Sequence, residues 1–303
     1  MRKVGLNGIT FAFVLAGGSC TPKWNGNVAI NDPSIIGPIK RFTSSGGKCI
    51  ISFGGANGPY LENSCTSSVQ LAAAYKQAIE ASGCNHIDLD FESWLNNIDM
   101  VNQAIKSVQQ TTGCTVSYTL AADENRLNSF GKQVLNSAKA QGVDVDLVNT
   151  ICFDFRPSGP IGDATITCAK TVHNYMATVW PEKSSNELYS MLGVTSMIGI
   201  WDSRSIFTLK HSQQLVNWAQ KNNIGQLAFW SLNRDNGDCP GSESARGTCS
   251  GISQNQWDFT RTILPFCGKN VSPFRQSQIV QALLSGLLSL YNRVNNFFIL
   301  LIK

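Results

Sequence analysis

The chain has 303 residues, of which 43% are hydrophobic and 15% are charged, and its formal net charge is +4. This is enough apolar sequence for one large α/β barrel or for two smaller domains. The mild charge comes without a Lys/Arg cluster, so it gives no reason to expect a nucleic-acid partner.

The N-terminal segment allows two interpretations. Residues 1–3 and the apolar run 9–16 resemble the basic and hydrophobic regions of an export signal, and 17–19 resembles its cleavage region. The same run is rich in β-branched and aromatic residues and ends in Gly-Gly, as a buried strand does. We favour the strand, because Asn7 and Gly8 dilute the hydrophobic region of a signal.

Strand-like apolar runs alternate with helical patterns along the chain. The strand-like runs are centred near Thr10, Ile50, Leu89, Ser117, Val148, Leu192 and Leu227. Helical spacing of apolar residues occurs over 35–42, 71–81, 98–108, 134–140, 172–179, 215–219 and 257–264. This alternation predicts parallel βα units with right-handed crossovers. Seven units approach the eight of a (β/α)8 TIM barrel, so one unit is missing.

Ten cysteines are many for a cytosolic enzyme of this size. They form no CxxC or CxxH pair, so the sequence does not predict a zinc site. We therefore expect several disulfides and an oxidising, extracellular location. Cys239 and Cys249, ten residues apart in a loop rich in Gly, Ser and Pro, are the pair that we predict first. The connectivity of the others stays open.

The stretch 85–92 alternates acidic with apolar residues. Successive side chains of a strand point to opposite faces, so Asp88, Asp90 and Glu92 share one face and stand ~6.6 Å apart at their Cα atoms. Apolar residues on the other face and in the flanks indicate a strand buried in a parallel sheet, not a solvated edge strand. Packing does not require three carboxylates there, so we interpret them as functional.

The C-terminal ends of barrel strands meet at one mouth. The other strands end in Ser52-Phe53-Gly54-Gly55, in Phe153-Asp154 and in Trp230. We expect them to bring a tight glycine turn, another acid and an aromatic surface beside the three carboxylates. Paired carboxylates next to an aromatic surface, against which sugar C–H groups can lie, are typical of glycoside hydrolysis.

These motifs resemble a known family. Asp88-Leu-Asp90-Phe-Glu92 resembles the Asp-x-Asp-x-Glu core of glycoside hydrolase family 18, and Ser52-Phe-Gly-Gly55 resembles its second signature. The stretches 11–15, 20–24, 142–149, 191–199 and 229–235 are similar to compact bacterial-type chitinases of the chitinase-D-like group. The similarity spans 8–266, so we expect a catalytic barrel over 1–268 and a tail, 269–303, outside it.

The resemblance implies retaining, substrate-assisted hydrolysis of β-1,4-linked N-acetylglucosamine polymers, with no cofactor and no metal. It implies that Glu92 protonates the leaving oxygen, that Asp90 orients the acetamido nitrogen and that Asp88 lies behind Asp90. Crowded carboxylates share protons, which raises the pKa of the acid. The expected substrate-binding residues are Trp230, Asp154, Tyr118, Phe53, Gly54, Gly55 and Asp202.

Three departures from the family pattern affect these expectations. Asn85 replaces an Asp that often begins the fuller signature. The family's Met-x-Tyr-Asp motif corresponds here to a stretch with Phe153 and Phe155 and no tyrosine. Losing the tyrosine's hydrogen bond in the transition state would raise the barrier by ~2–4 kcal/mol, unless Tyr118 or another donor substitutes. Similar proteins also have a strand before the segment that opens at Val4, so we expect an open barrel that starts at its second strand, with two unpaired edges.

The tail carries two further patterns. Asn270-Val-Ser272 is a glycosylation sequon, compatible with secretion. Residues 278–303 have helical periodicity, but polar residues between 292 and 296 leave no 20-residue apolar span. An amphipathic surface helix, or translated sequence foreign to the natural protein, fits this segment better than a membrane anchor.

We therefore predict a secreted, monomeric chitinase that binds chitin or another N-acetylglucosamine-containing glycan, without a nucleic-acid or membrane partner. One alternative is a chitin- or glycan-binding lectin on the same barrel. The other is an endo-β-N-acetylglucosaminidase that cleaves the chitobiose core of N-glycans. The intact Glu92 favours an enzyme over the lectin.

Overall fold

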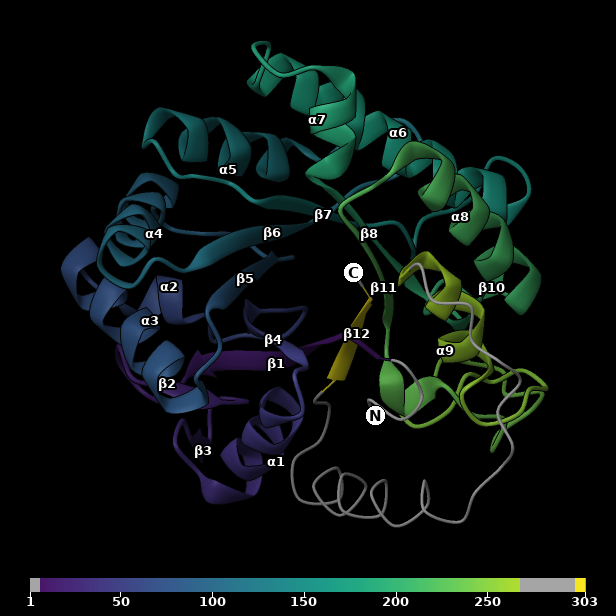
Figure 1. The fold of residues 1–303 in the computed structure, drawn as a ribbon, viewed down its shortest axis with the longest axis horizontal. Helices are drawn as coiled ribbons and strands as arrows, with labels where there is room; N and C mark the ends of the chain where they lie inside the picture. The colour runs from purple at the N-terminus through teal and green to yellow at the C-terminus, as the bar shows by residue number, and fades with distance from the viewer. Residues whose placement is uncertain (1–5, 268–297, 303) are drawn as a thin grey trace.

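The computed structural model describes residues 6–267 and 298–302, in which seven parallel strands form most of a barrel wall (Figure 1). They are, in chain order, β1 (Gly8–Ala16), β4 (Lys48–Gly54), β5 (His86–Phe91), β6 (Thr115–Ala121), β7 (Leu147–Ile151), β8 (Leu192–Met197) and β11 (Gln226–Trp230). Each pairs in parallel with its neighbours in this order. The predicted barrel is confirmed, and the run 10–14 is part of a strand, as favoured.

Helices form a layer outside the wall (Figure 1). They are α1 (Pro33–Ser44), α2 (Leu61–Ser64), α3 (Ser68–Ser82), α4 (Ile98–Thr112), α5 (Ser129–Ala140), α6 (Ile161–Val179), α7 (Ser185–Ser190), α8 (Leu209–Asn222) and α9 (Asp258–Ile263). Polar side chains define where many of them begin: Ser67 accepts a hydrogen bond from the backbone at the start of α3, and Asn97 does so for α4. Glycines in the left-handed conformation end both helices.

Short elements complete the described chain. They are β2 (Pro22–Trp24), β3 (Val28–Ala29), β9 (Gly199–Ile200), β10 (Ile206–Phe207) and the 3-10 turns η2 (Leu232–Arg234) and η3 (Leu264–Cys267). β2 and β3 extend the sheet beside β1, whereas β9 and β10 form a separate two-stranded sheet. Within the described ranges, no helix has both the length and the apolar character of a membrane span.

The barrel wall is closed by a strand from the far end of the chain, β12 (Phe298–Ile302). It lies between β1 and β11 and runs antiparallel to both (Figure 1). The expectation of two unpaired edges is therefore wrong, and the predicted tail is not wholly outside the sheet. Unpaired N–H and C=O groups at a strand edge attract an extended apolar segment, and β12 supplies one. The helix predicted over 278–303 is wrong at 298–302, because these residues form β12. The rest of that segment and the sequon at Asn270 lie outside the described residues.

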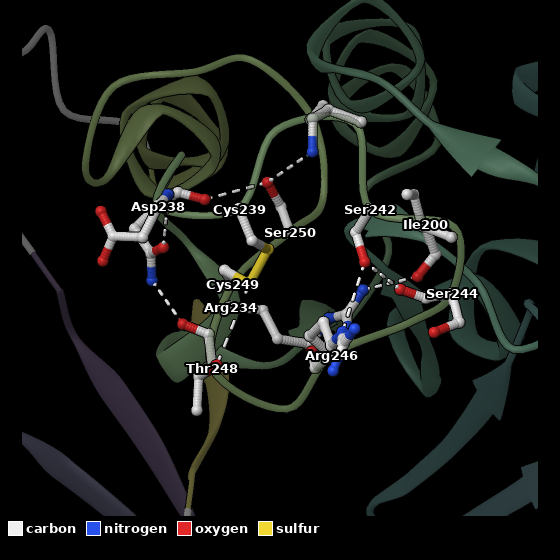
Figure 2. Close-up of a disulfide and its surroundings, with 12 residues drawn as sticks. Ile200, Arg234, Asp238, Cys239, Ser242, Ser244, Arg246, Thr248, Cys249 and Ser250 are labelled. Carbon is white, nitrogen blue, oxygen red and sulfur yellow. Dashed lines mark hydrogen bonds between the residues drawn. A yellow bond between two sulfur atoms is a disulfide. The ribbon is translucent and has the colours of Figure 1, made fainter.

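Four disulfides join elements of the described chain: Cys20–Cys65, Cys49–Cys84, Cys152–Cys168 and Cys239–Cys249. The expectation of several disulfides is confirmed, and so is the predicted pair, which closes the loop after β11 (Figure 2). Cys114, the residue before β6, is a buried free thiol. The disulfides fix loops at both ends of the barrel, and the loop after β11 borders the mouth described next.

Candidate active site

The acidic strand β5 points its carboxylates into the barrel. Its apolar residues face the helix layer, where the Phe91 ring lies 6.4 Å from that of Tyr118. Asp88 and Asp90 are buried, and Asp90 and Glu92 line a cavity at the C-terminal ends of the strands. The predicted alternation therefore brings the three acids together at one mouth.

Asp88 lies deepest and is held by three hydroxyl groups. Ser117 Oγ (2.5 Å) and Thr119 Oγ1 (2.8 Å) donate to its Oδ1, and Ser52 Oγ (2.7 Å) donates to Oδ2. Burial raises the pKa of Asp88, and the three hydrogen bonds oppose that increase. The carboxyl group is thus fixed in position directly below Asp90.

Asp90 has the opposite environment. Among the residues that the structure describes, its Oδ1 atom is buried and has no hydrogen-bond partner. Burial raises the pKa of Asp90 well above its usual value, and the neighbouring Glu92 and Asp88 raise it further. A buried acceptor without a donor is costly, so Asp90 is suited to a ligand that brings an N–H or O–H group.

Glu92 is the first residue beyond the strand and lies at the open mouth. Desolvation of its carboxyl group raises the pKa of Glu92 to about 7, and the charge of Asp154 adds to this shift. A carboxyl group that is partly protonated at neutral pH can act as a general acid and, after losing its proton, as a general base.

The cavity has a volume of about 260 Å³ and combines acids with aromatic side chains. Trp230, at the end of β11, is partly exposed and stacks on Phe13 of β1 with ring centroids 6.1 Å apart. Asp154 and Asp202 contribute two further acids from the loops after β7 and after β9. The complete lining is Phe13, Leu15, Asn25, Ala56, Asn57, Asp90, Glu92, Thr119, Ile151, Phe153, Asp154, Thr195, Met197, Asp202 and Trp230.

A buried arginine supports the acidic side of the cavity. Arg234, four residues after Trp230, donates from one guanidinium nitrogen to the carbonyl oxygens of Ile198 (2.8 Å) and Ile200 (2.6 Å). The other terminal nitrogen donates to the carbonyl oxygen of Arg246, in the disulfide-closed loop (Figure 2). Burial lowers the pKa of Arg234 to about 10, although the negative charges of Asp202 and Asp154 act to raise it. Arg234 thus links the loop after β11 to the segment that leads to Asp202.

Two predicted substrate-binding residues lie elsewhere. The Tyr118 hydroxyl donates to Asn102 Oδ1 of α4 (2.5 Å), and the Phe53 ring packs edge-on against Tyr75 of α3 at 4.7 Å. Both side chains are fully buried in the helix layer, so the prediction that they bind substrate is wrong. Strand alternation explains this, because the preceding residues, Ser117 and Ser52, point into the barrel at Asp88.

The predicted glycines shape the site without lining the cavity. Gly54 and Gly55 have φ values of +96° and +89°, which non-glycine residues rarely adopt. A Cβ atom on Gly54 would collide with the Asp90 carbonyl oxygen, and one on Gly55 would collide with the Phe13 ring. Gly55 N–H donates to the Asp90 carbonyl oxygen (2.8 Å). The turn therefore positions the acidic strand.

Several residues of the site were not predicted. Ser117 and Thr119 could have been found, because they alternate on β6 in the register that faces Asp88. Phe13 lies in the chitinase-like stretch 11–15, but only its stacking on Trp230 shows that it lines the cavity. Asn25, Asn57 and the buried Tyr60 come from loops whose sequences carry no comparable signal.

The barrel of seven parallel strands, closed by the antiparallel β12, and its acids at the C-terminal mouth define the TIM-barrel class of glycoside hydrolases. Within the described residues, no group of three or more His, Cys, Asp or Glu side chains is arranged to hold a metal ion.

Comparisons with known proteins give the family. The catalytic domain of the hyperthermophilic chitinase from Pyrococcus furiosus is 31% identical, with 90% of each chain covered and a TM-score of 0.82. Active domain 2 of that chitinase, solved with chito-oligosaccharides, gives a TM-score of 0.83 at the same identity and coverage. The chain therefore belongs to the chitinases of glycoside hydrolase family 18. No protein-family model matches it.

Curated relatives agree with this family. A probable bifunctional chitinase/lysozyme of Escherichia coli is 28% identical over 286 residues, and Endochitinase 11 of Metarhizium anisopliae is 30% identical over 219 residues. These alignments cover 86% and 65% of the chain. The chain spans 32% and 42% of the lengths of these two relatives.

Proposed function

We propose that the chain hydrolyses β-1,4-linked N-acetylglucosamine polymers by a substrate-assisted mechanism with retention of configuration. The observation that carries the proposal is the buried Asp90 carboxylate, whose Oδ1 has no partner among the described residues while it lines the cavity beside Glu92. An acetamido N–H group is a donor of the kind that this oxygen needs. The chitinase domain solved with chito-oligosaccharides supports the substrate class.

In the first step, Glu92 donates its proton to the glycosidic oxygen as the bond from that oxygen to C1 breaks. The acetamido carbonyl oxygen of the same sugar forms a new bond to C1, and Asp90 accepts the N–H of the resulting oxazolinium ion. In the second step, Glu92 takes a proton from water, the water oxygen attacks C1 and the ring reopens. Two displacements at C1 retain its configuration. Asp88, fixed by its three donors, acts on Asp90 through its charge, which raises the pKa of Asp90.

Trp230, backed by Phe13, forms the surface on which the sugar lies at the cleavage site, and Asp154 and Asp202 contact its polar edge. Phe153 lines the cavity where the family has a tyrosine, and the Tyr118 hydroxyl faces α4. We therefore propose a rate reduced by the loss of one hydrogen bond, at ~2–4 kcal/mol of barrier. The four disulfides support an extracellular location.

The test compares the wild-type chain with Glu92→Gln on chitin oligomers and on a high-mannose glycoprotein. We expect the wild type to cleave the oligomers, with the β-anomer as the first product by NMR, and to leave the glycoprotein intact. Loss of the acid in Glu92→Gln should lower kcat by about 10³-fold. Binding of oligomers without cleavage would instead indicate a lectin, and release of the glycan would indicate an endo-β-N-acetylglucosaminidase.

A further inference from the structure

The backbone at Glu92 depends on a partner outside the sheet. The ladders of β5 end at Asp90 toward β4 and at Phe91 toward β6. The Glu92 N–H donates instead to the hydroxyl oxygen of Tyr60 (3.1 Å), and the next amide, Ser93 N–H, donates to the same oxygen (2.9 Å). One tyrosine hydroxyl thus takes the place of the inter-strand hydrogen bonds at Glu92, the proposed acid.

The same hydroxyl is also bonded to the glycine turn. Tyr60 donates its proton to the Gly55 carbonyl oxygen (2.7 Å), and Gly55 N–H donates to the Asp90 carbonyl oxygen (2.8 Å). The backbone of the acidic strand is therefore fastened to the β4 turn on both sides of Phe91. Because the chain leaves the sheet here, these bonds define the direction in which the Glu92 side chain emerges.

Tyr60 is suited to this arrangement by its burial. Its side chain is 3% exposed, and its ring lies 6.2 Å from that of Phe91. Burial raises the pKa of Tyr60 well above its usual value, so the phenol stays neutral, donates one hydrogen bond and accepts two. Three residues further on, Asn63 holds the segment after Glu92: its Nδ2 donates to the Trp94 carbonyl oxygen and its Oδ1 accepts from Asn96 N–H, each at 2.8 Å.

We propose that Tyr60 is a positioning residue for the proton donor Glu92. The inference rests on the proposed function, because it assigns Tyr60 to the acid of that reaction. Tyr60 does not line the cavity, and within the described residues no hydrogen bond holds the Glu92 carboxyl group itself. The direction of that carboxyl group is then determined by its backbone, and the backbone is held by Tyr60.

The experiment uses the full chain and two substrates that differ in their need for an acid. A chitin oligomer has a poor leaving group that must be protonated, whereas a 4-nitrophenyl chitobioside has a leaving group that departs without protonation. In Tyr60→Phe, we expect kcat on the oligomer to fall by about 10- to 100-fold, as for a misplaced catalytic group, with KM changed by less than about threefold. We expect the single-turnover release of 4-nitrophenolate, which precedes the step in which Glu92 acts as a base, to change by less than about threefold.

Two variants calibrate the result. Glu92→Gln should reproduce the selective loss on the oligomer in a more severe form. Tyr75→Phe is the matched control, because it removes another buried tyrosine hydroxyl, one that donates to Glu62 Oε1 (2.7 Å). It should lower folding stability while leaving the ratio of the two rates, oligomer kcat and single-turnover aryl release, as in the wild type.

An equal loss on both substrates, or an unchanged kcat on the oligomer, would overturn the positioning role while the wild-type activity still supports the proposed function. A wild-type chain that cleaves neither substrate would overturn both. Hydrogen exchange covers the case in which Tyr60→Phe does not fold. The Glu92 and Ser93 amides of the wild type should be protected, and free exchange at both would contradict the inference.

Discussion

Three carboxyl groups on one strand have different chemistry because their surroundings differ. Asp88 accepts three hydroxyl donors, Asp90 Oδ1 has no partner among the described residues, and Glu92 lies at the mouth with a pKa of about 7. Their different environments make Glu92 suited to act as the acid and Asp90 suited to bind a ligand, as in other sites with paired carboxyl groups. The charge of Asp154, which also lines the cavity, contributes to the raised pKa of Glu92.

The first prediction concerns that charge. Asp154 raises the pKa of Glu92, so Asp154→Asn should lower it, and an acid with a lower pKa loses its proton at lower pH. We expect the alkaline limb of the kcat/KM profile to move to lower pH by up to about one unit. Asn also tolerates the left-handed backbone at this position, where φ is +58°.

The matched control is Asp163→Asn, which removes the same charge from α6, outside the barrel. Its alkaline limb should coincide with that of the wild type. A limb that stays fixed in Asp154→Asn, or that moves to higher pH, would show that Asp154 does not act on Glu92 through its charge.

At the scale of elements, the turn after β4 determines where the acidic strand lies. Gly54 and Gly55 allow the chain to leave β4 with positive φ and to pass close to Asp90. Glycines with positive φ also end α3 and α4, but these two, Gly83 and Gly113, face open space. The same conformational freedom thus serves helix termination in one place and close backbone approach in the other.

The second prediction separates these two uses. Gly54→Ala adds backbone strain and a collision with the Asp90 carbonyl oxygen, so the free energy of unfolding should fall by about 3 kcal/mol or more. Gly113→Ala adds strain alone and should lower it by about 1 kcal/mol. Urea denaturation measures both. Equal losses would mean that the turn relaxes away from Asp90 at little cost.

At the scale of the whole molecule, barrel closure joins segments from opposite ends of the described chain. β12 pairs with β1 through Gly8–Leu301 to Phe11–Phe298, and with β11 through Leu227–Ile302 to Trp230–Ile299. Phe13 and Trp230, which stack in the cavity, belong to the two strands on either side of β12. The geometry of the sugar-binding surface therefore depends on this closure.

The third prediction tests closure directly. Leu300 is paired with Ile9 on one side and with Phe229 on the other. Leu300→Pro removes a backbone donor in the middle of the strand, so we expect a lower urea midpoint and faster hydrogen exchange in β1 and β11. Amides of β5 and β6, across the barrel, serve as the internal control. Unchanged exchange in β1 and β11 would show that β12 does not close the wall in solution.

The sequence by itself determined the features that depend on near neighbours. Periodicity over a few residues located the seven parallel strands and placed Asp88, Asp90 and Glu92 on one face. Loop composition and a short separation indicated the pair Cys239–Cys249. Local sterics and pleating act within a strand or turn, so they can be read from a short stretch.

Only the tertiary structure decided which face of each strand is functional and what closes the wall. Tyr118 and Ser117 are adjacent on β6, and the register with β5 turns the serine to Asp88 and the tyrosine to α4. Tyr60 meets the Glu92 amide, and residues 298–302 meet β1, across long stretches of chain. Such contacts form because unpaired backbone groups need partners, and the packing of distant segments selects those partners.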